Sequence, residues 1–514
     1  MNKFVQAMQD ASNQTFTENG QLAVKSTKNS IVDLFGTIGA LRTRTEDQII
    51  DLFVKAFCED KLIALKMLFY ARDIRGGLGE RRTFKVIAQY LARHYPEDMK
   101  ANLHLVPEYG RWDDLYCFVG TPCEDSAFEL IKNQINQDLK DVKESKKTGK
   151  YKPISLCAKW LKSVQASSSE SKKLARLTAR KIGLHNDRVT ADYYFEYRNY
   201  ILALSTLRKH IKVVERLMST NQFDKIEYSE VPSLAMKRYK NAFNKHDEER
   251  FNKYVQSLIK GDSDAKINAS TLYPYDIIRP AINESSQASK VKVDAISQAQ
   301  WDALPNYSDG ENNFLVVCDL SGSMYWYNNA QAAATSIGLG IYFAERNKGA
   351  FHNVCMTFSS DPEFITFKDG MKLEDKIRHI YTTAKVGYDT NLYKTMKLIC
   401  DTAVKGNIPQ EELPKSVVLI SDMEFNQAVT DRTMYDVIDD MFRSAGYETP
   451  NIVFWNVQSR NNVFHIDRNQ SGVQLASGSS PSVFKALANN IGLTPLDMVL
   501  NVLNSERYSA VRVA

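Results

Sequence analysis

The sequence lacks the features that mark several common classes of protein. No apolar run reaches the about 18 residues that a membrane-spanning helix needs. The N-terminal stretch MNKFVQAMQDASNQTF has no apolar core of the signal-peptide kind. The seven cysteines are scattered without a CxxC pair, and the eight histidines form no HExxH. These absences exclude a disulfide framework and the common zinc motifs. We therefore expect a cytoplasmic protein with reduced thiols and no membrane contact.

Catalytic signatures are also missing. No Ser–His–Asp or Cys–His set is evident, and no second carboxylate cluster is available for a two-metal site. The glycine-rich turn at residues 76–79 is not a Walker loop, because no Gly-Lys-Ser/Thr follows it. A metal-dependent hydrolase is therefore the weakest of the functions considered, and we expect that the protein is not an enzyme.

The charge of the chain is divided unevenly along its length. The 514 residues carry 66 Lys and Arg against 61 Asp and Glu, a net charge of +5. Residues 301–514 hold 18 basic and 24 acidic residues, a net of −6, so residues 1–300 hold 48 and 37, a net of +11. A basic first part suggests a polyanionic partner, and the alternative is a well-solvated helical surface.

The hydrophobic pattern divides the chain into parts. Residues 1–29 are polar and predict a flexible N-terminal arm. Residues 30–300 show helical spacing broken by short turns, which predicts an all-α, HEAT-like solenoid of stacked helix pairs. The polar stretch 285–313 resembles a linker or domain entry. Residues 301–514 alternate strands and helices, which predicts an α/β, Rossmann-like domain with a mostly parallel sheet. The expected strands are 314–320, 352–358, 364–367, 416–421 and 452–457, and the expected helices are 329–345, 391–404, 434–444 and 482–491.

One motif in the second part suggests a metal site. The apolar run FLVVCD ends in Asp319-Leu-Ser321-Gly-Ser323, which places a carboxylate and two hydroxyls just after a buried strand. A loop with Thr390 follows, and a second apolar strand ends at Asp422. Because ligands in open α/β sheets bind beyond the carboxyl ends of the strands, we expect these five side chains to meet. Such small oxygen ligands suit a hard divalent cation, with Mg²⁺ favoured and Mn²⁺ or Ca²⁺ as alternatives.

This set is similar to the metal-ion-dependent adhesion site of the von Willebrand factor A domain. The resemblance implies that Asp319, Ser321, Ser323, Thr390 and Asp422 hold the metal, which takes an acidic group from a partner. The aromatic residues 325–327 directly follow the motif and either narrow access to it or form a lip for a partner.

Several segments of the first part mix cations with aromatic residues, as single-stranded nucleic acids require. The turn at 72–82 combines arginines with glycines whose amides can bind phosphate, and the alternative is a tight inter-helix turn with paired arginines. The motif 108–114 is interpreted as a buried hydrogen-bonded corner. The candidate phosphate contacts are Arg75, Arg81, Arg82, Arg208, Lys209, Lys212, Lys237 and Arg238.

The same segments resemble the TROVE module of the Ro autoantigen family, and more closely its uncharacterised bacterial and viral relatives. The motifs are RDIRGGLGERRTF, EYGRWDDL, LRKHIKVVERLMS, MKRYKNAF, HDEERFNKY and NASTLYPYDII, followed by DLSGSM. The resemblance covers about residues 30–505. It implies a helical ring, closed at an A domain, that binds single-stranded 3′ ends or small structured RNA and works with exonucleases.

The sequence therefore favours a non-catalytic RNA-binding protein with a metal-bearing A domain. The alternative is a protein-interaction adaptor, in which the metal captures an acidic residue of a partner protein and the helical region is a scaffold.

Overall fold

The computed structural model describes residues 8, 11–185, 193–262, 264–307, 313–359, 361–384, 390–427, 434–466 and 471–514. A helical N-terminal region precedes an α/β region that is built on a six-stranded sheet. This coarse division confirms the prediction of a helical first part followed by an α/β second part. None of the described helices is long and apolar enough to span a bilayer.

The first helices are defined by side chains that cap their amino ends. Thr45 and Gln48 form a capping box at the start of α3, and the Asp60 carboxylate accepts from the Ile63 amide at 2.9 Å at the start of α4. The helices of this region are α2 (Ser30–Phe35), α3 (Glu46–Glu59), α4 (Lys61–Arg72), α5 (Arg81–His94), α6 (Pro96–Asn102), α7 (Val106–Tyr109), α8 (Glu124–Thr148), α9 (Cys157–Trp160), α10 (Ser169–Lys181), α11 (Tyr193–Glu196), α12 (Arg198–His210), α13 (Val214–Ser219), α14 (Ser233–His246), α15 (Glu248–Lys260), α16 (Pro274–Ile282) and α17 (Ala295–Asp302).

The sheet has the strand order β5-β4-β3-β6-β7-β8. All neighbours pair in parallel except β4 and β5, which are antiparallel. Strands β3 and β6 are buried along their whole length, as expected for central strands with both faces covered. The strands are β3 (Phe314–Asp319), β4 (Val354–Phe358), β5 (Phe364–Thr366), β6 (Ser416–Ser421), β7 (Asn451–Asn456) and β8 (Val473–Ser477), and the helices are α18 (Gln331–Arg346), α19 (Leu373–Thr383), α20 (Leu392–Gly406), α21 (Met434–Ser444), α22 (Ser482–Ala488) and α23 (Pro495–Leu503).

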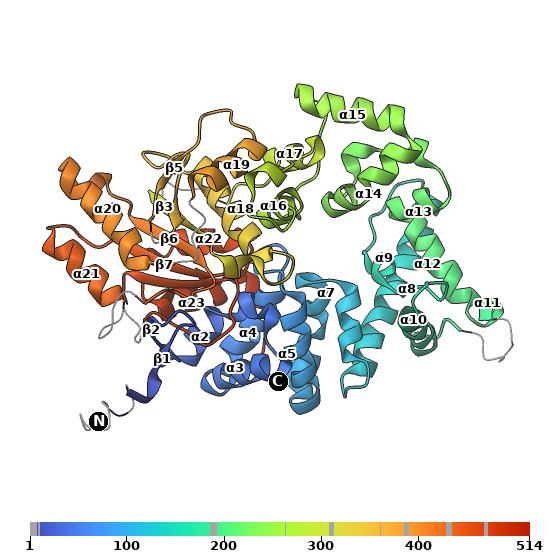
Figure 1. The fold of residues 1–514 in the computed structure, drawn as a ribbon. Coiled ribbons are helices and arrows are strands. Elements are labelled where there is room, and N and C mark those ends of the chain that lie inside the picture. The colour runs from blue at the N-terminus through green and yellow to red at the C-terminus, as the bar shows by residue number, and fades with distance from the viewer. Residues whose placement is uncertain are drawn as a thin grey trace.

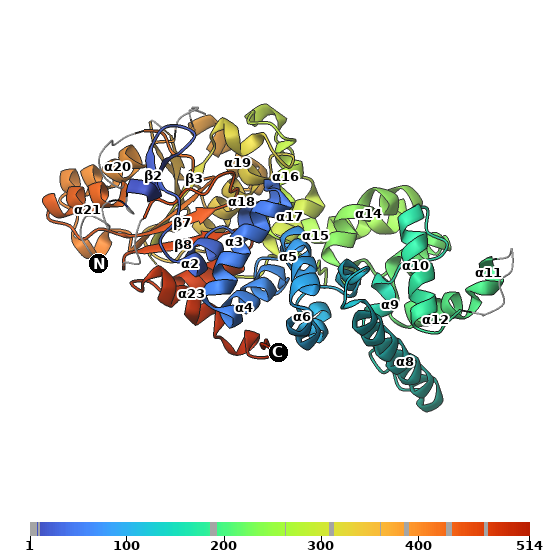
Figure 2. The same ribbon diagram turned by 90° about the horizontal axis from the view of Figure 1, so that it is seen from below.

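Helices α8 to α15 project from the body of the molecule as an arc (Figures 1 and 2). At the first end of the helical region, α2 and α4 pack against α23, and at its last end α16 packs along α18. The last contact is close, because a methyl group at Gly338 of α18 would lie 3.0 Å from Pro274 Cβ. Both ends of the helical region are therefore attached to the α/β region.

The two regions share one hydrophobic core. A single cluster of buried residues extends from Ile31 of α2 to Val511 near the C-terminus, and it includes both α16 and α18. A separate cluster around Phe243 and Phe251 holds α13, α14 and α15 together within the arc. The stretch 285–313, which resembles a linker in the sequence, contributes α17, whose Trp301 is buried and donates to Glu345 at 3.0 Å.

Residues near the N-terminus are hydrogen-bonded to the α/β region. Strands β1 (Gln14–Phe16) and β2 (Leu22–Val24) form an antiparallel pair within the segment for which the sequence predicts a flexible arm. Isolated bridges join Gly20 to Asn426 and Val24 to Phe464. The arm thus lies against the α/β region near the carboxyl end of β6 (Figure 1).

Candidate metal centre

The predicted metal ligands lie where the strand order of the sheet reverses. Strand β3 is followed in sequence by β4 on one side, whereas β6 pairs with β3 on the other side. The crevice beyond the carboxyl ends of such a strand pair is the usual ligand site of open α/β folds. Asp319 ends β3 and Asp422 directly follows β6, so both carboxylates are delivered to this crevice.

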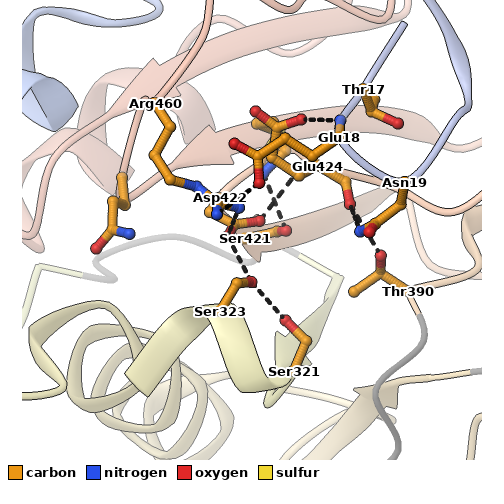
Figure 3. Close-up of polar contacts among 12 residues, drawn as sticks. Thr17, Glu18, Asn19, Ser321, Ser323, Thr390, Ser421, Asp422, Glu424 and Arg460 are labelled. Carbon is orange, nitrogen blue, oxygen red and sulfur yellow. Dashed lines mark hydrogen bonds and ion pairs between the residues drawn. The ribbon is translucent and has the colours of Figure 1, made fainter. Parts of the chain in front are cut away.

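Four of the five predicted ligands come together in a hydrogen-bonded chain, of which Figure 3 labels Ser321, Ser323 and Asp422. The Asp319 carboxylate accepts from the Ser321 amide at 2.8 Å, and the Ser321 and Ser323 hydroxyls are 3.2 Å apart. The Ser323 hydroxyl donates to Asp422 Oδ2 at 2.7 Å. The Ser421 hydroxyl, which the sequence analysis did not select, donates to the second Asp319 oxygen.

The surroundings of Asp319 favour its protonated form. Burial of Asp319, reinforced by the nearby charge of Asp422, raises the pKa of Asp319 to about 7, even though Ser421 and Ser321 donate to it. A cation between the two carboxylates would relieve both effects. The converging carboxylate and hydroxyl oxygens therefore fit a hard divalent cation.

Thr390 lies at the edge of this cluster. Its hydroxyl is 3.2 Å from the Glu424 carbonyl oxygen and 3.0 Å from Asn426 Oδ1, and its amide donates to the same Asn426 oxygen at 3.0 Å. These contacts join Thr390 to the segment that follows Asp422. The preceding residues 387–389, which belong to the predicted loop, lie outside the described residues.

Arg460 and Glu18 complete the cluster, and the sequence analysis found neither. Arg460 Nη2 is 2.8 Å from Asp422 Oδ2, and Arg460 Nη1 is 2.7 Å from Glu18 Oε2. The Arg460 side chain is only 9% exposed, whereas that of Glu18 is 42% exposed. No local sequence signal connects either residue to the DxSxS motif, because Glu18 is about 300 residues before it and Arg460 about 140 after it.

Backbone contacts hold Glu18 in this position. The Glu18 amide donates to Glu424 Oε2 at 2.7 Å, and the Thr17 hydroxyl donates to the Phe425 carbonyl oxygen at 2.5 Å. The Asn19 side-chain amide donates to the Glu424 carbonyl oxygen at 2.6 Å. Residues 17–19 thus lie alongside the segment that comes after Asp422 in the chain (Figure 3).

The aromatic residues after the motif separate into two environments. The Tyr325 hydroxyl is partly buried and donates to the Tyr381 hydroxyl at 3.1 Å. Trp326 and Tyr327 are exposed. Two of the three rings that directly follow the motif in sequence are therefore exposed.

Among the described residues, no group of three or more His, Cys, Asp or Glu side chains is placed to hold a metal ion. The four predicted ligands that meet at Asp319 are two carboxylates and two hydroxyls.

Three of the eight predicted phosphate contacts are engaged inside the helical region. Arg81 pairs with Asp113 at 2.7 Å and with Asp114 at 2.6 Å. Arg208 donates to the carbonyl oxygens of Ala158 and Leu161 at 2.8 and 2.7 Å. Lys237 donates to the Asp276 carbonyl oxygen.

The other five predicted contacts are exposed at the surface. Arg75 donates to the Glu108 carbonyl oxygen, and Arg82 donates to the Arg44 carbonyl oxygen. Both side chains are nevertheless exposed, so part of each guanidinium faces solvent. The exposed residues of this set are Arg75, Arg82, Lys209, Lys212 and Arg238.

The glycine-rich turn holds α4 and α5 together through its own backbone. The Leu78 amide donates to the Tyr70 carbonyl oxygen at 3.1 Å, the Gly79 amide to that of Asp73 at 3.0 Å, and the Glu80 amide to that of Ala71 at 2.7 Å. A methyl group at Gly77 would lie 2.1 Å from the Tyr70 carbonyl oxygen. These three amides cap the end of α4 and do not face a ligand, which favours the inter-helix turn over the phosphate loop.

An exposed aromatic stack lies where α8 and α12 end, and the sequence analysis did not select it. The rings of Tyr151 and His210 are 4.8 Å apart and nearly parallel at 11°, and Tyr151 is 64% exposed. His210 is fixed by a 2.7 Å hydrogen bond to the Lys152 carbonyl oxygen. Lys209 and Lys212, both exposed, lie within two residues of His210 in the chain. An exposed ring beside cations is the combination on which a nucleic-acid base stacks.

Comparisons with known proteins give two family models. The family described as domain of unknown function DUF2828 matches residues 17–127 and 124–306, and domain of unknown function DUF7788 matches residues 313–499. The uncharacterized protein L728 of Acanthamoeba polyphaga mimivirus is 30% identical over 526 residues, which is 96% of this chain and 87% of that protein. The crystal structure of the Deinococcus radiodurans Ro (RSR) protein aligns with 90% of this chain and 99% of its own, at 14% identity and a TM-score of 0.47, a likeness too low to carry an argument.

Proposed function

Starting from the fact that the chain belongs to the DUF2828 family, we propose that it is a non-catalytic RNA-binding protein. The helical arc would bind the RNA, and the α/β region would carry a divalent cation, with Mg²⁺ as the best fit. The single observation that carries the RNA proposal is the Tyr151–His210 stack with exposed Lys209 and Lys212 beside it.

The charge distribution supports the same partner. The net charge of +11 lies in residues 1–300, which form the helical region. Phosphate contacts by exposed lysines and arginines supply most of the affinity of sequence-independent binding. The exposed Tyr151 ring adds base stacking, which favours single-stranded RNA, including a 3′ end, because its bases are free to stack.

The finer architecture belongs to the same proposal. The strand order with β3 next to β6, and the DxSxS motif at the end of β3, support a von Willebrand factor A type for the α/β region. The attachment of both ends of the helical region supports a HEAT-like arc of the TROVE type that closes on the A domain. An exonuclease partner and a cytoplasmic location stay predictions.

In the metal site, each residue has a distinct task. Ser321 and Ser323 would offer hydroxyl oxygens to the cation, while Asp319 and Asp422 would provide negative charge and hold its water molecules. When bound, the cation would supply a positive charge that accepts an acidic group of a partner. Ser421 keeps the Asp319 carboxylate oriented by donating to it.

Fluorescence polarisation with a labelled single-stranded RNA at two salt concentrations tests the proposal. We expect wild-type affinity to fall steeply with salt. The Tyr151→Ala variant should lose about tenfold in affinity with its salt dependence unchanged, because stacking carries no charge. The Lys209→Ala/Lys212→Ala variant should lower the slope of log affinity against log salt by about 1.4, which corresponds to two phosphate contacts.

A matched control removes two exposed lysines of the α/β region, in the variant Lys348→Ala/Lys405→Ala. This change of charge is equal, but it should leave affinity within about twofold, because the residues lie outside the arc. Equal wild-type affinity at both salt concentrations, or equal effects of the two double variants, would refute RNA binding at the stack.

The second candidate function is a protein-interaction adaptor, favoured by the exposed Trp326 and Tyr327 beside the metal site. Exposed aromatic rings next to an electrophilic cation suit an acidic partner segment. The Asp319→Ala variant separates the candidates. It should abolish Mn²⁺ binding and leave RNA affinity unchanged if the arc binds RNA, whereas a parallel loss of RNA affinity would place the RNA at the α/β region.

A further inference from the structure

Arg460 already occupies a cation position at the predicted metal site. Its guanidinium lies 2.8 Å from Asp422 Oδ2, the same oxygen that accepts from the Ser323 hydroxyl at 2.7 Å. A divalent cation on Ser323, with its water molecules held by Asp422, would therefore compete with a buried arginine for this oxygen. Two positive groups at one carboxylate oxygen repel each other strongly where water is scarce.

The N-terminal arm holds Arg460 in place. Glu18 Oε2 contacts Arg460 Nη1 at 2.7 Å, and Asp422 contacts the neighbouring Nη2 (Figure 3). Asn461 fixes the second Glu18 oxygen through a 3.0 Å hydrogen bond and also donates to Glu424 at 3.1 Å. Arg460 is thus bound between one carboxylate of the arm and one of the metal site.

The contacts of Glu18 and β1 are suited to local release. The Glu18 side chain is 42% exposed, and strand β1 pairs only with β2 among the described strands. Strand β1 and Glu18 are largely exposed, whereas Ala23 and Val24 of β2 are buried, so low-cost local opening is confined to β1 and Glu18. The pair of Arg460 with Asp422 is buried and cannot open in the same way as long as Glu18 holds the Arg460 guanidinium.

We propose that Arg460 is an internal counter-cation, clasped by Glu18 of the N-terminal arm, that competes with a divalent cation for Asp422. The proposal rests on the proposed metal site and adds its regulation. When the arm is docked, Arg460 neutralises Asp422 and disfavours the metal. When a cation and its water molecules engage Asp422, Arg460 is repelled, its pair with Glu18 weakens, and Glu18 and β1 are released. Because coupling between two equilibria is reciprocal, release of Glu18 and β1 also favours the cation.

Mn²⁺ binding to the full chain, measured by titration calorimetry, tests the competition. The Arg460→Gln variant should bind Mn²⁺ about tenfold or more tightly than the wild type, because it removes the competing charge. The Arg460→Lys variant keeps the charge and should bind like the wild type. The matched control Arg443→Gln makes the same change at an exposed ion pair with Asp439 on α21 and should also leave affinity unchanged.

Hydrogen exchange of residues 14–18 tests the release of β1 and Glu18 without any substitution. Added Mn²⁺ should accelerate exchange over these residues in the wild type. The Glu18→Gln variant should show fast exchange there even without Mn²⁺.

The outcomes separate the two levels of the proposal. Equal Mn²⁺ affinity of Arg460→Gln and the wild type, or slower exchange of the arm with Mn²⁺, would refute the proposed competition between Arg460 and the cation. Neither result would contradict the proposed metal site. The absence of saturable binding in the wild type, Arg460→Gln and Asp319→Ala alike would overturn the metal site and the competition together. Because the exchange experiment uses the wild type, a poorly folded variant does not prevent a decision.

Discussion

Replacing Asp114 by asparagine tests whether the arginines near the glycine turn hold the helices together. The buried Asp114 carboxylate accepts from Arg72 Nε at 2.8 Å, from Arg81 Nε at 2.6 Å and from the Arg111 amide at 3.0 Å. The Arg72 side chain is itself only 3% exposed. Asparagine keeps the shape of the carboxylate, but it removes the charge and turns an NH₂ group toward an arginine donor.

The expected loss follows from what is left unpaired. Breaking a buried ion pair by removing one partner costs about 3–5 kcal/mol, because the other charge stays buried. Arg72 is in that situation, whereas Arg81 is 38% exposed and keeps Asp113 at 2.7 Å. We therefore expect a loss near the lower limit, about 3 kcal/mol. In the control Asp51→Asn, an exposed pair with Lys55 is broken, which should cost less than about 1 kcal/mol.

Hydrogen exchange is the appropriate assay, because a chain of 514 residues does not unfold in one step. Amides of α4 and α5 should exchange about a hundredfold faster in Asp114→Asn, which is the effect of about 3 kcal/mol on local opening. Unchanged exchange in α4 and α5, together with weaker RNA binding, would refute the structural role and return Arg81 to the surface that binds phosphate.

The pH dependence gives a second measurement. Burial raises the pKa of Asp114, but Arg72 and Arg81 outweigh it and hold the pKa below the ordinary 3.8. A carboxyl group with a depressed pKa stabilises the folded state above its unfolded pKa, and this contribution disappears as pH falls through the folded value. The wild type should therefore lose protection in α4 and α5 below about pH 4, and the asparagine variant should lack this step.

Three further predictions concern packing and protonation elsewhere. Gly39→Ala should destabilise the junction of the helical region with β8 by about 1–3 kcal/mol, because the new methyl group would lie 2.7 Å from the backbone of Gly478. Hydrogen exchange at the junction should then be faster than in the wild type, and unchanged exchange would contradict the prediction. Gly340→Ala should lower the melting temperature, because its methyl group would lie 2.1 Å from Cys318 Sγ, and Cys318→Ala in the same chain should restore part of the loss; purely additive effects would contradict the contact. Burial lowers the pKa of His465 from 6.5 to about 4. The stabilising contribution of His465 is therefore complete above pH 6.5 and disappears as pH falls to 4, a loss of about 3 kcal/mol in all. His465→Gln should flatten this part of a curve of stability against pH.

The sequence predicted the central strands and the meeting of Asp319, Ser321, Ser323 and Asp422, because both depend on local patterns. Strand β6 spans the predicted residues 416–421, and β3 ends at Asp319. Once two apolar runs are neighbouring parallel strands, the residues that follow them must lie at one edge of the sheet. Strand β8 was missed, because the short stretch Val473–Ser477 alternates Val, Leu and Ser with Gln474 and Ala476 and carries no distinct buried-strand signal.

The contacts around Arg460 could not be predicted, because they join distant parts of the chain. Glu18 lies in a polar segment whose weak pattern predicts a flexible arm, and its partner is more than 400 residues away. Nothing within either segment specifies the other. Such a pairing depends on the backbone of residues 424–426, to which Thr17 and Asn19 are hydrogen-bonded.

The basic residues show why a count of cations does not predict which of them face solvent. The count of cations does not distinguish Arg208, which donates to two backbone carbonyl groups, from Lys209, which is exposed one residue later. Helix geometry makes this difference, since adjacent residues on a helix point about 100° apart. If Arg208→Ala and Lys209→Ala are compared, the first should destabilise the packing of α12 on α9 and the second should only weaken RNA binding. An equal effect of both on RNA affinity at unchanged stability would show that burial in the free protein does not decide which cations reach the phosphates.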